Sequence, residues 1–214
     1  MRILIADDHP LYRDALELVV KEVYPSADIV SCASQAEVLD VVQSDDSFDL
    51  ILLDLKLPDA TEFTCLTLVR NRTSVTPIVI VSAVEEATTM REAIEYGATG
   101  YLPKSSSRTT MRNALQLVMA GGVFMPASAV SSSWLRRSVR PRAKNRATEQ
   151  SSLTERQQTV LEIMAEGKSN KAIANELSIT EITVKAHVSA ILRKLGVSNR
   201  VQAAMLAKDV LEKK

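Results

Sequence analysis

Acidic side chains follow two short apolar segments in the first sixty residues. Asp7 and Asp8 come directly after residues 3–6, and Asp54 comes directly after residues 50–53. In an open parallel sheet the carboxyl ends of the strands form one binding crevice, so these acids are expected to meet there. Three close carboxylates repel one another and favour a hard cation such as Mg²⁺. A carboxylate beside a metal ion can attack phosphorus, because the metal neutralises charge on the transferring phosphoryl group.

Two more polar groups stand near the ends of later apolar segments. Ser82 closes the run that begins at Pro77, and Lys104 follows Tyr101-Leu102. A lysine ammonium and a serine hydroxyl could hold the oxygens of a newly transferred phosphate. The alternative is that all these polar residues are solvated loop ends with helix-capping roles. Five such groups at the ends of four expected strands favour a phosphoryl-transfer site.

The segments that must position these groups alternate between strand and helix patterns. The run at 50–53 is fully apolar, as expected for a strand covered on both faces. Five strand–helix units predict an α/β domain with a parallel sheet and helices on both faces. We expect strands at 3–6, 28–33, 50–53, 77–82 and 101–102, and helices near 11–23, 34–43, 62–72, 85–96 (stopped by Gly97) and 108–120.

Charge divides the chain, although its formal net charge is zero. Residues 1–130 hold 10 basic and 18 acidic side chains, residues 131–150 hold 6 and 1, and residues 151–214 hold 10 and 7. An acidic front and a basic rear indicate separate modules, of which only the rear suits a phosphate backbone. The Ser, Arg and Pro content of residues 131–150 is typical of a linker. We therefore expect domains at 1–122 and 149–214, joined by a Ser/Arg-rich linker at 123–148.

Composition also excludes some classes of protein. No uninterrupted apolar run reaches the about 18 residues of a membrane span. The first apolar segment is too short for a signal peptide and ends in two acids, so we expect a cytoplasmic protein. Cys32 and Cys65 lack metal-ligand spacing, and we expect both to be buried, reduced thiols.

The rear of the chain has the pattern of four short helices, near 154–166, 170–177, 181–195 and 200–211. Thr154 and Gln157 predict a capping box at the first helix, Thr180 can cap the third, and Ser169 or Asn170 can cap the second. The third helix has an apolar stripe on one side and a partly basic face on the other. A short helix of this kind, held from behind, fits the major groove of DNA. Its apolar stripe consists of Val184, Val188, Ile191, Leu192 and Leu195.

Residues 1 to about 122 resemble the receiver domain of bacterial response regulators. The matching residues are Asp7-Asp8, Asp54 with Pro58 four residues on, Ser82-Ala83 and Lys104. The resemblance implies a flavodoxin-like, five-stranded parallel sheet in the order 2-1-3-4-5. It also implies that a sensor histidine kinase phosphorylates one aspartate.

The resemblance assigns a role to each matching residue. Asp54 is the phosphoacceptor, Ser82 is the switch hydroxyl, Lys104 is the phosphate partner and Tyr101 is the switch aromatic. The implied Mg²⁺ ligands are Asp7, Asp8, Asp54 and the backbone carbonyl of Lys56, with Asp8 a more direct ligand than Asp7.

Two positions near this pocket leave alternatives open. His9 could be a catalytic base or a residue of the pocket rim, and we favour the rim because the phosphodonor supplies its own histidine. Glu62 stands where the family often has a glycine with positive φ, so this position has either mild strain or a different loop path.

Residues from about 149 to 212 resemble the LuxR-type helix-turn-helix domain of the NarL/FixJ class of transcription factors. The match runs through Leu153-Thr154-Glu155-Arg156, Ala165-Glu166-Gly167, Ser169-Asn170-Lys171, Thr183-Val184-Lys185-Ala186-His187-Val188, Lys194-Leu195-Gly196-Val197 and Asn199-Arg200. The resemblance implies an all-α, four-helix domain that binds double-stranded promoter DNA.

The first turns of a recognition helix usually reach base edges, and lysine can donate to guanine acceptors. We expect Arg193 to contact phosphate, whereas Lys171 and Arg200 are either phosphate contacts or structural salt-bridge residues. The expected DNA-contacting residues are Lys171, Ile182, Thr183, Lys185, Ala186, Ser189, Arg193 and Arg200.

The last helix carries two apolar stripes, Val201/Ala204/Met205 and Ala203/Leu206/Val210/Leu211. One stripe can pack on the domain and leave the other free for a homodimer contact. The alternative is that both stripes are core.

These observations predict a two-component transcription factor, not an enzyme, that is activated by phosphotransfer to Asp54. The alternative is a transcription factor whose receiver is a phosphorylation-independent docking module. A phosphatase acting through Asp54 is disfavoured, since no second acid stands ready to protonate a leaving group.

Overall fold

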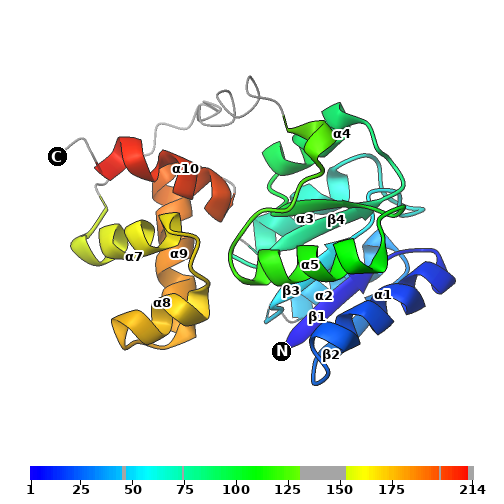
Figure 1. The fold of residues 1–214 in the computed structure, drawn as a ribbon, viewed down its shortest axis with the longest axis horizontal. Helices are drawn as coiled ribbons and strands as arrows, with labels where there is room; N and C mark the ends of the chain where they lie inside the picture. The colour runs from blue at the N-terminus through cyan, green and yellow to red at the C-terminus, as the bar shows by residue number, and fades with distance from the viewer. Residues whose placement is uncertain (45–46, 74, 131–152, 198, 212–214) are drawn as a thin grey trace.

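A computed structural model describes residues 1–44, 47–73, 75–130, 153–197 and 199–211 (Figure 1). Its first part is a five-stranded sheet in the predicted order, β2-β1-β3-β4-β5, in which every neighbouring pair is parallel. The strands are β1 (Arg2–Ala6), β2 (Asp28–Cys32), β3 (Leu50–Leu53), β4 (Ile78–Ser82) and β5 (Gly100–Pro103).

Helices cover both faces of the sheet, because successive side chains of a strand point to opposite faces. Ile3 and Ile5 belong to one apolar cluster with α1 and α5, whereas Leu4 and Ala6 belong to another with α2, α3 and α4. Burial on both faces accounts for the continuous apolar runs in the sequence. The helices are α1 (Pro10–Val23), α2 (Gln35–Ser44), α3 (Thr64–Arg72), α4 (Ala87–Glu95) and α5 (Arg108–Met119).

Two of these helices begin later than the sequence predicts. The first residue of α3 is Thr64, because the φ of Glu62 is +41° and cannot continue a right-handed helix. The first residue of α4 is Ala87, because Glu86 is extended, with φ −68° and ψ 126°. Gly97, with φ +107°, follows the end of α4 as predicted.

The second part is the predicted four-helix domain. Its helices are α7 (Glu155–Ala165), α8 (Asn170–Leu177), α9 (Glu181–Leu195) and α10 (Arg200–Leu211). Thr154 and Gln157 form the predicted capping box, and the hydroxyls of Ser169 and Thr180 cap α8 and α9. The domain core includes Val160, Leu161, Ile173, Val184, Val188, Ile191, Leu192 and Ala203. No helix within the described ranges is long and apolar enough to cross a membrane.

The predicted linker is wrong at its start. Phe124 forms a parallel bridge with Gly100, and its carbonyl oxygen accepts the N–H of Tyr101 at 2.8 Å. The short helix η1 (Ala127–Ala129) follows and packs beside α4. Residues 123–130 therefore extend the first domain, because their apolar side chains pack on its core. The rest of the predicted linker, residues 131–148, lies outside the described residues.

Both cysteines are free thiols in the interior of the first domain, as predicted. Burial raises the pKa of Cys32 to about 11 and the pKa of Cys65 to about 12. Both thiols therefore stay protonated at neutral pH, which fits a packing role.

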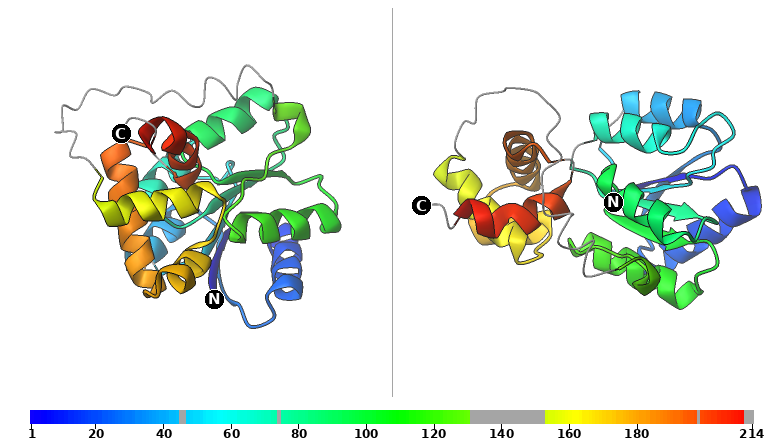
Figure 2. Two further views of the ribbon diagram at one scale, coloured as in Figure 1. Left: turned by 60° about the vertical axis from the view of Figure 1, so that its left-hand side comes forward. Right: turned by 90° about the horizontal axis from the view of Figure 1, so that it is seen from above.

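The two domains pack together at the end of the sheet where the strands begin (Figures 1 and 2). Asn199, just before α10, is 1% exposed and donates from Nδ2 to the carbonyl oxygens of Ile94 and Ala98 at 3.3 and 3.2 Å. Lys185 of α9 lies 3.6 Å from Asp49, which precedes β3. The four-helix domain thus contacts the end of the sheet opposite to the one where the acidic residues lie.

Candidate functional sites

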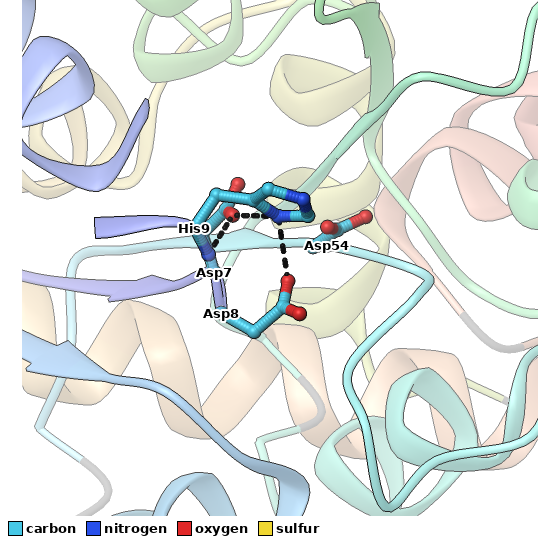
Figure 3. A group of neighbouring side chains, drawn as sticks. All are labelled: Asp7, Asp8, His9 and Asp54. Carbon is cyan, nitrogen blue, oxygen red and sulfur yellow. Dashed lines mark hydrogen bonds and ion pairs between the residues drawn. The ribbon is translucent and has the colours of Figure 1, made fainter. Parts of the chain in front are cut away.

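The acidic residues meet at the carboxyl end of the sheet, as predicted (Figure 3). Strands β1 and β3 are paired through their last residues, so Asp7 and Asp54 leave the sheet side by side. One ligand atom each from Asp7, Asp8, His9 and Asp54 lie within 4.8 Å of one another. The two strand-end carboxylates are almost fully buried, with Asp7 0% and Asp54 3% exposed. Little bulk water is therefore available to screen their repulsion.

Lys104 extends into this pocket from the end of β5. Its Nζ lies 2.8 Å from Oδ2 of Asp54 and 2.7 Å from Oδ2 of Asp7. Burial lowers the pKa of the Lys104 ammonium, but hydrogen bonds to these two carboxylates outweigh burial and raise the pKa above its ordinary value. A protonated lysine therefore joins the two acids at neutral pH.

Ser82 and Tyr101 lie behind the pocket on β4 and β5, and both are fully buried. The hydroxyl of Ser82 accepts the N–H of Val84 at 3.3 Å, and the hydroxyl of Tyr101 donates to the carbonyl oxygen of Val84 at 2.7 Å. Burial raises the pKa of Tyr101 to about 12. The backbone of Val84 thus connects the two side chains that the sequence predicts as the switch pair.

Loop residues border the pocket. The N–H of Lys56 donates to Oδ1 of Asp54 at 3.1 Å. The imidazole of His9 is 67% exposed, as expected of a rim residue, and its Nδ1 lies 2.8 Å from Oδ1 of Asp8. Glu62 adopts positive φ, so of the two alternatives the structure has mild backbone strain, on the order of 1 kcal/mol.

One contact in the pocket escapes the sequence analysis. The Nζ of Lys104 lies 4.8 Å from the centre of the Tyr12 ring, a cation–π contact. Burial raises the pKa of Tyr12, and the charges of Asp7 and Asp54 raise it further. The sequence places Tyr12 on the first turn of the helix that follows the acid pair, but this position does not determine where the ring lies.

The donor set of the pocket fits a divalent cation. Asp7, Asp8 and Asp54 carry three negative charges, and Lys104 supplies one positive charge. The remaining two negative charges match one divalent ion, and carboxylate oxygens are the ligands that Mg²⁺ prefers.

Helix α9 presents two faces, as predicted. Its apolar stripe is buried, with Val184, Val188, Ile191 and Leu192 at most 3% exposed. On the other side Thr183, Ala186 and Arg193 are exposed, and Lys185 and Ser189 are half-buried. The side chain of Ile182 lies outside the described part of the chain.

Lys171 and Arg200 differ from each other. Lys171 is exposed near the start of α8. Arg200 donates from Nη2 to the carbonyl oxygen of Lys168 at 2.7 Å and from Nη1 to Oδ1 of Asn170 at 3.4 Å. Burial lowers the pKa of Arg200. These bonds favour a structural role for Arg200, with carbonyl and amide oxygens as its partners.

The two stripes of α10 also differ. Ala203, Leu206 and Ala207 are buried against the domain, whereas Ala204 is partly exposed. The described members of the second stripe, Ala203 and Leu206, therefore pack on the domain. The side chains of Val201, Met205, Val210 and Leu211 lie outside the described residues.

The receiver-like sheet, the acidic pocket and the helix-turn-helix together define a response regulator with a DNA-binding output domain. Residues 3–116 match the model of the response regulator receiver domain, and residues 151–207 match that of the bacterial regulatory proteins of the luxR family. The chain belongs to the response regulators of the NarL/FixJ class and is a transcription factor.

Relatives of similar length support this assignment. The chain is 42% identical over 211 residues to the glycerol metabolism activator of Pseudomonas putida, which covers 98% of this chain and 96% of the relative. It is 33% identical over 204 residues to the nitrate/nitrite response regulator protein NarL of Escherichia coli K12, with 95% and 93% covered. The fold resembles the RcsB response regulator of Salmonella typhimurium, with a TM-score of 0.56, 20% identity, and 95% and 97% of the two chains covered.

Proposed function

We propose that this transcription factor is activated when a sensor histidine kinase transfers a phosphoryl group to Asp54. The supporting observation is the Asp54 carboxylate, buried at a strand end beside Asp7 and bonded to Lys104 at 2.8 Å. One oxygen of Asp54 attacks the phosphorus of the kinase phosphohistidine. The new P–O bond forms as the P–N bond breaks, and the imidazole leaves with a proton from solvent.

Asp7, Asp8, Asp54 and the backbone carbonyl of Lys56 would hold Mg²⁺ in this pocket. The ion supplies neutralisation of charge on the transferring phosphoryl group. Lys104, which follows β5 at the same end of the sheet as Asp54, adds a second cation that can bond an oxygen of the phosphate once Asp54 is modified.

Phosphate on Asp54 acts through Ser82 and Tyr101. When the hydroxyl of Ser82 turns to a phosphate oxygen, it gives up the N–H of Val84 that it accepts here. Tyr101 is bonded to the carbonyl oxygen of the same residue, so its position is coupled to that change. The phosphate therefore makes different contacts in the two arrangements, which is what a shift of population requires.

The output is DNA binding through α9. Lys185, Ala186 and Ser189, with Ile182 and Thr183, are proposed to face bases, and Arg193 and Lys171 are proposed to face phosphates. A homodimer through α10 would read a two-fold promoter site. A solved RcsB structure describes two RcsB dimers bound to two parallel DNAs, in a protein with a similar fold. Binding to promoter DNA would place the protein in the cytoplasm.

We further propose that the receiver comprises residues 1–130 and the DNA-binding domain residues 149–214. The linker then begins after Val130. The chain is proposed to have no catalytic turnover of its own, and we expect no hydrolysis of small phosphoesters above that of the Asp54→Asn variant.

Intact-mass measurement with a small acyl phosphate and Mg²⁺ tests the phosphotransfer. We expect the mass of one added phosphoryl group per chain, none on the Asp54→Asn variant, and none when a chelator removes the metal. DNA affinity and oligomeric state are then measured with and without beryllofluoride. An unmodified chain with unchanged DNA affinity would support the alternative, a receiver that only docks other proteins.

A further inference from the structure

A cavity of about 400 Å³ lies between the receiver and the DNA-binding domain, at the N-terminal ends of the strands and so at the opposite end of the sheet from Asp54. Cavities of this size accept small ligands, and domain interfaces are a common place for them. The charged residues that line it are Asp49 and Arg70 from the receiver, and Lys171, Glu181, Lys185 and Arg200 from the DNA-binding domain.

The charge of this cavity is positive. Its wall holds four basic side chains and two acidic ones, which leaves two positive charges. One acid is already engaged, since Asp49 lies 3.6 Å from Lys185. An anion with two negative charges would balance the excess, and a phosphate group carries about −1.5 to −2 at neutral pH.

Arg70 supplies a buried positive charge beside the cavity. This arginine is only 7% exposed, and its Nη1 donates to the carbonyl oxygens of Thr73 and Thr76, both at 2.8 Å. Its Nε and Nη2 have no hydrogen-bond partner in the described part of the chain. These two nitrogens are themselves buried, so Arg70 acts on an anion in the cavity through its positive charge, which little water screens.

The surroundings keep Arg70 in place. A Cβ on Gly97 would stand 3.0 Å from Cγ of Arg70, so the absence of a side chain at this position makes room for the arginine. Burial lowers the pKa of Arg70 to about 9, which leaves the guanidinium charged at neutral pH. Ser169 and Asn170, at the N-terminus of α8, also line the cavity, and that end of a helix favours anions.

We propose that this cavity binds a small phosphate-bearing dianion between the two domains. The ligand would bridge Arg70 of the receiver and Lys171 of the DNA-binding domain, and so stabilise the domain arrangement of this structure. Lys171 and Lys185 are also proposed DNA contacts, so the dianion and DNA would oppose each other. By thermodynamic linkage each would weaken the other by the same factor.

Calorimetric titration of the full-length, unphosphorylated chain with inorganic phosphate tests the binding step. A chelator removes metal from the acidic pocket, and chloride keeps the ionic strength constant. We expect saturable binding at one site per chain, weakened at least tenfold in Arg70→Met and in Lys171→Gln. The Lys171 side chain is exposed, so this second variant keeps the test valid if Arg70→Met does not fold. Arg112→Gln removes one exposed charge elsewhere on the receiver and should bind phosphate unchanged.

The absence of saturable heat, or equal weakening by Arg112→Gln, would overturn the proposal. Phenyl phosphate is titrated in parallel, since its binding distinguishes a site for phosphate monoesters from one for free phosphate. If Lys171→Gln changes DNA affinity but not phosphate binding, the cations serve DNA alone and the site is also refuted. None of these outcomes depends on phosphorylation of Asp54, so the two proposals fail independently.

Discussion

At the residue scale, the acidic pocket depends on one cation. Lys104 forms ion pairs with two almost fully buried carboxylates, those of Asp7 and Asp54. Removing one partner of a buried ion pair leaves the other charges without compensation and is strongly destabilising. The free energy of unfolding of the metal-free receiver should therefore depend more on Lys104 than on any exposed lysine.

We predict that Lys104→Met lowers the free energy of unfolding by roughly 2–4 kcal/mol at pH 7 without Mg²⁺. Millimolar Mg²⁺ should restore part of the loss, because the ion binds the folded state and supplies the missing charge. Urea denaturation with and without Mg²⁺ measures both effects, with Arg112→Met as the matched exposed control. A variant as stable as the original chain in the absence of metal would contradict this account.

Tyr101 links stability to alkaline pH. Its pKa is raised to about 12 in the folded chain, whereas the unfolded tyrosine has the ordinary value of 10.0. Between these two values the unfolded state has released the proton and the folded state has kept it, so stability falls as pH rises.

We predict that Tyr101→Phe costs about 1 kcal/mol at pH 7, because its hydrogen bond to Val84 is lost. The difference in free energy of unfolding between the two chains should shrink at pH 11. The original chain loses stability there because its unfolded state releases the Tyr101 proton, whereas the variant has no such proton. Urea denaturation at both pH values measures this change. Tyr96→Phe, at a position 42% exposed, is the matched control for removal of a tyrosine hydroxyl. An equal Tyr101→Phe difference at both pH values would count against the proposed linkage.

Most of the pocket was predictable residue by residue. Asp7, Asp54, Ser82 and Lys104 were identified because each follows an apolar run, and parallel strands bring their carboxyl ends together. The ring of Tyr12 beneath Lys104 was not predicted, since its position depends on how α1 sits on the sheet.

At the element scale, the stability of α9 depends on its C-terminal cap. The cap of α9 is Gly196, with φ +65° in the left-handed region. A Cβ at this position would meet no atom within 4 Å. Any cost of a side chain there is therefore conformational and not steric.

We predict that Gly196→Ala lowers the stability of the DNA-binding domain by about 1 kcal/mol, because a left-handed backbone disfavours alanine. Gly196→Asn should cost less, since asparagine tolerates this conformation best among the other residues. Thermal unfolding followed by far-UV circular dichroism gives the melting temperatures of the original chain and of the two variants. Equal melting temperatures for the alanine and glycine chains would show that α9 does not need its left-handed end.

Helix capping was predictable and two helix starts were not. The hydroxyls of Thr154, Ser169 and Thr180 signal local hydrogen bonds that depend on few residues. The starts of α3 and α4 depend on loop conformations at Glu62 and Glu86, which helical periodicity cannot reveal.

At the scale of the whole molecule, one asparagine forms two hydrogen bonds between the domains. Asn199 donates to two receiver carbonyls through Nδ2, while its Oδ1 accepts the N–H of Gln202 and caps α10. Sequence patterns did not predict this docking, because the receiver presents backbone carbonyl groups there, which every residue possesses. The two functions of the side chain use different atoms and can be separated by substitution.

We predict that Asn199→Asp separates the domains while α10 stays intact. The aspartate keeps the capping oxygen but replaces the donor with a carboxylate facing two carbonyls, at a cost of about 2 kcal/mol or more. Small-angle X-ray scattering should show a larger radius of gyration, and circular dichroism should show unchanged helix content. Asn113→Asp, on the exposed side of α5, is the matched control. A scattering curve identical to that of the original chain would refute this function of Asn199.

The acidic pocket and the contact between domains lie at the two opposite ends of the same five strands. A strand of five residues spans about 16 Å, so no side chain reaches from one end to the other. The residues around the acidic pocket and the residues that contact the DNA-binding domain can therefore be substituted independently of each other. A receiver engineered to accept a different kinase could still bind the DNA-binding domain, provided that the loops before the strands are not changed.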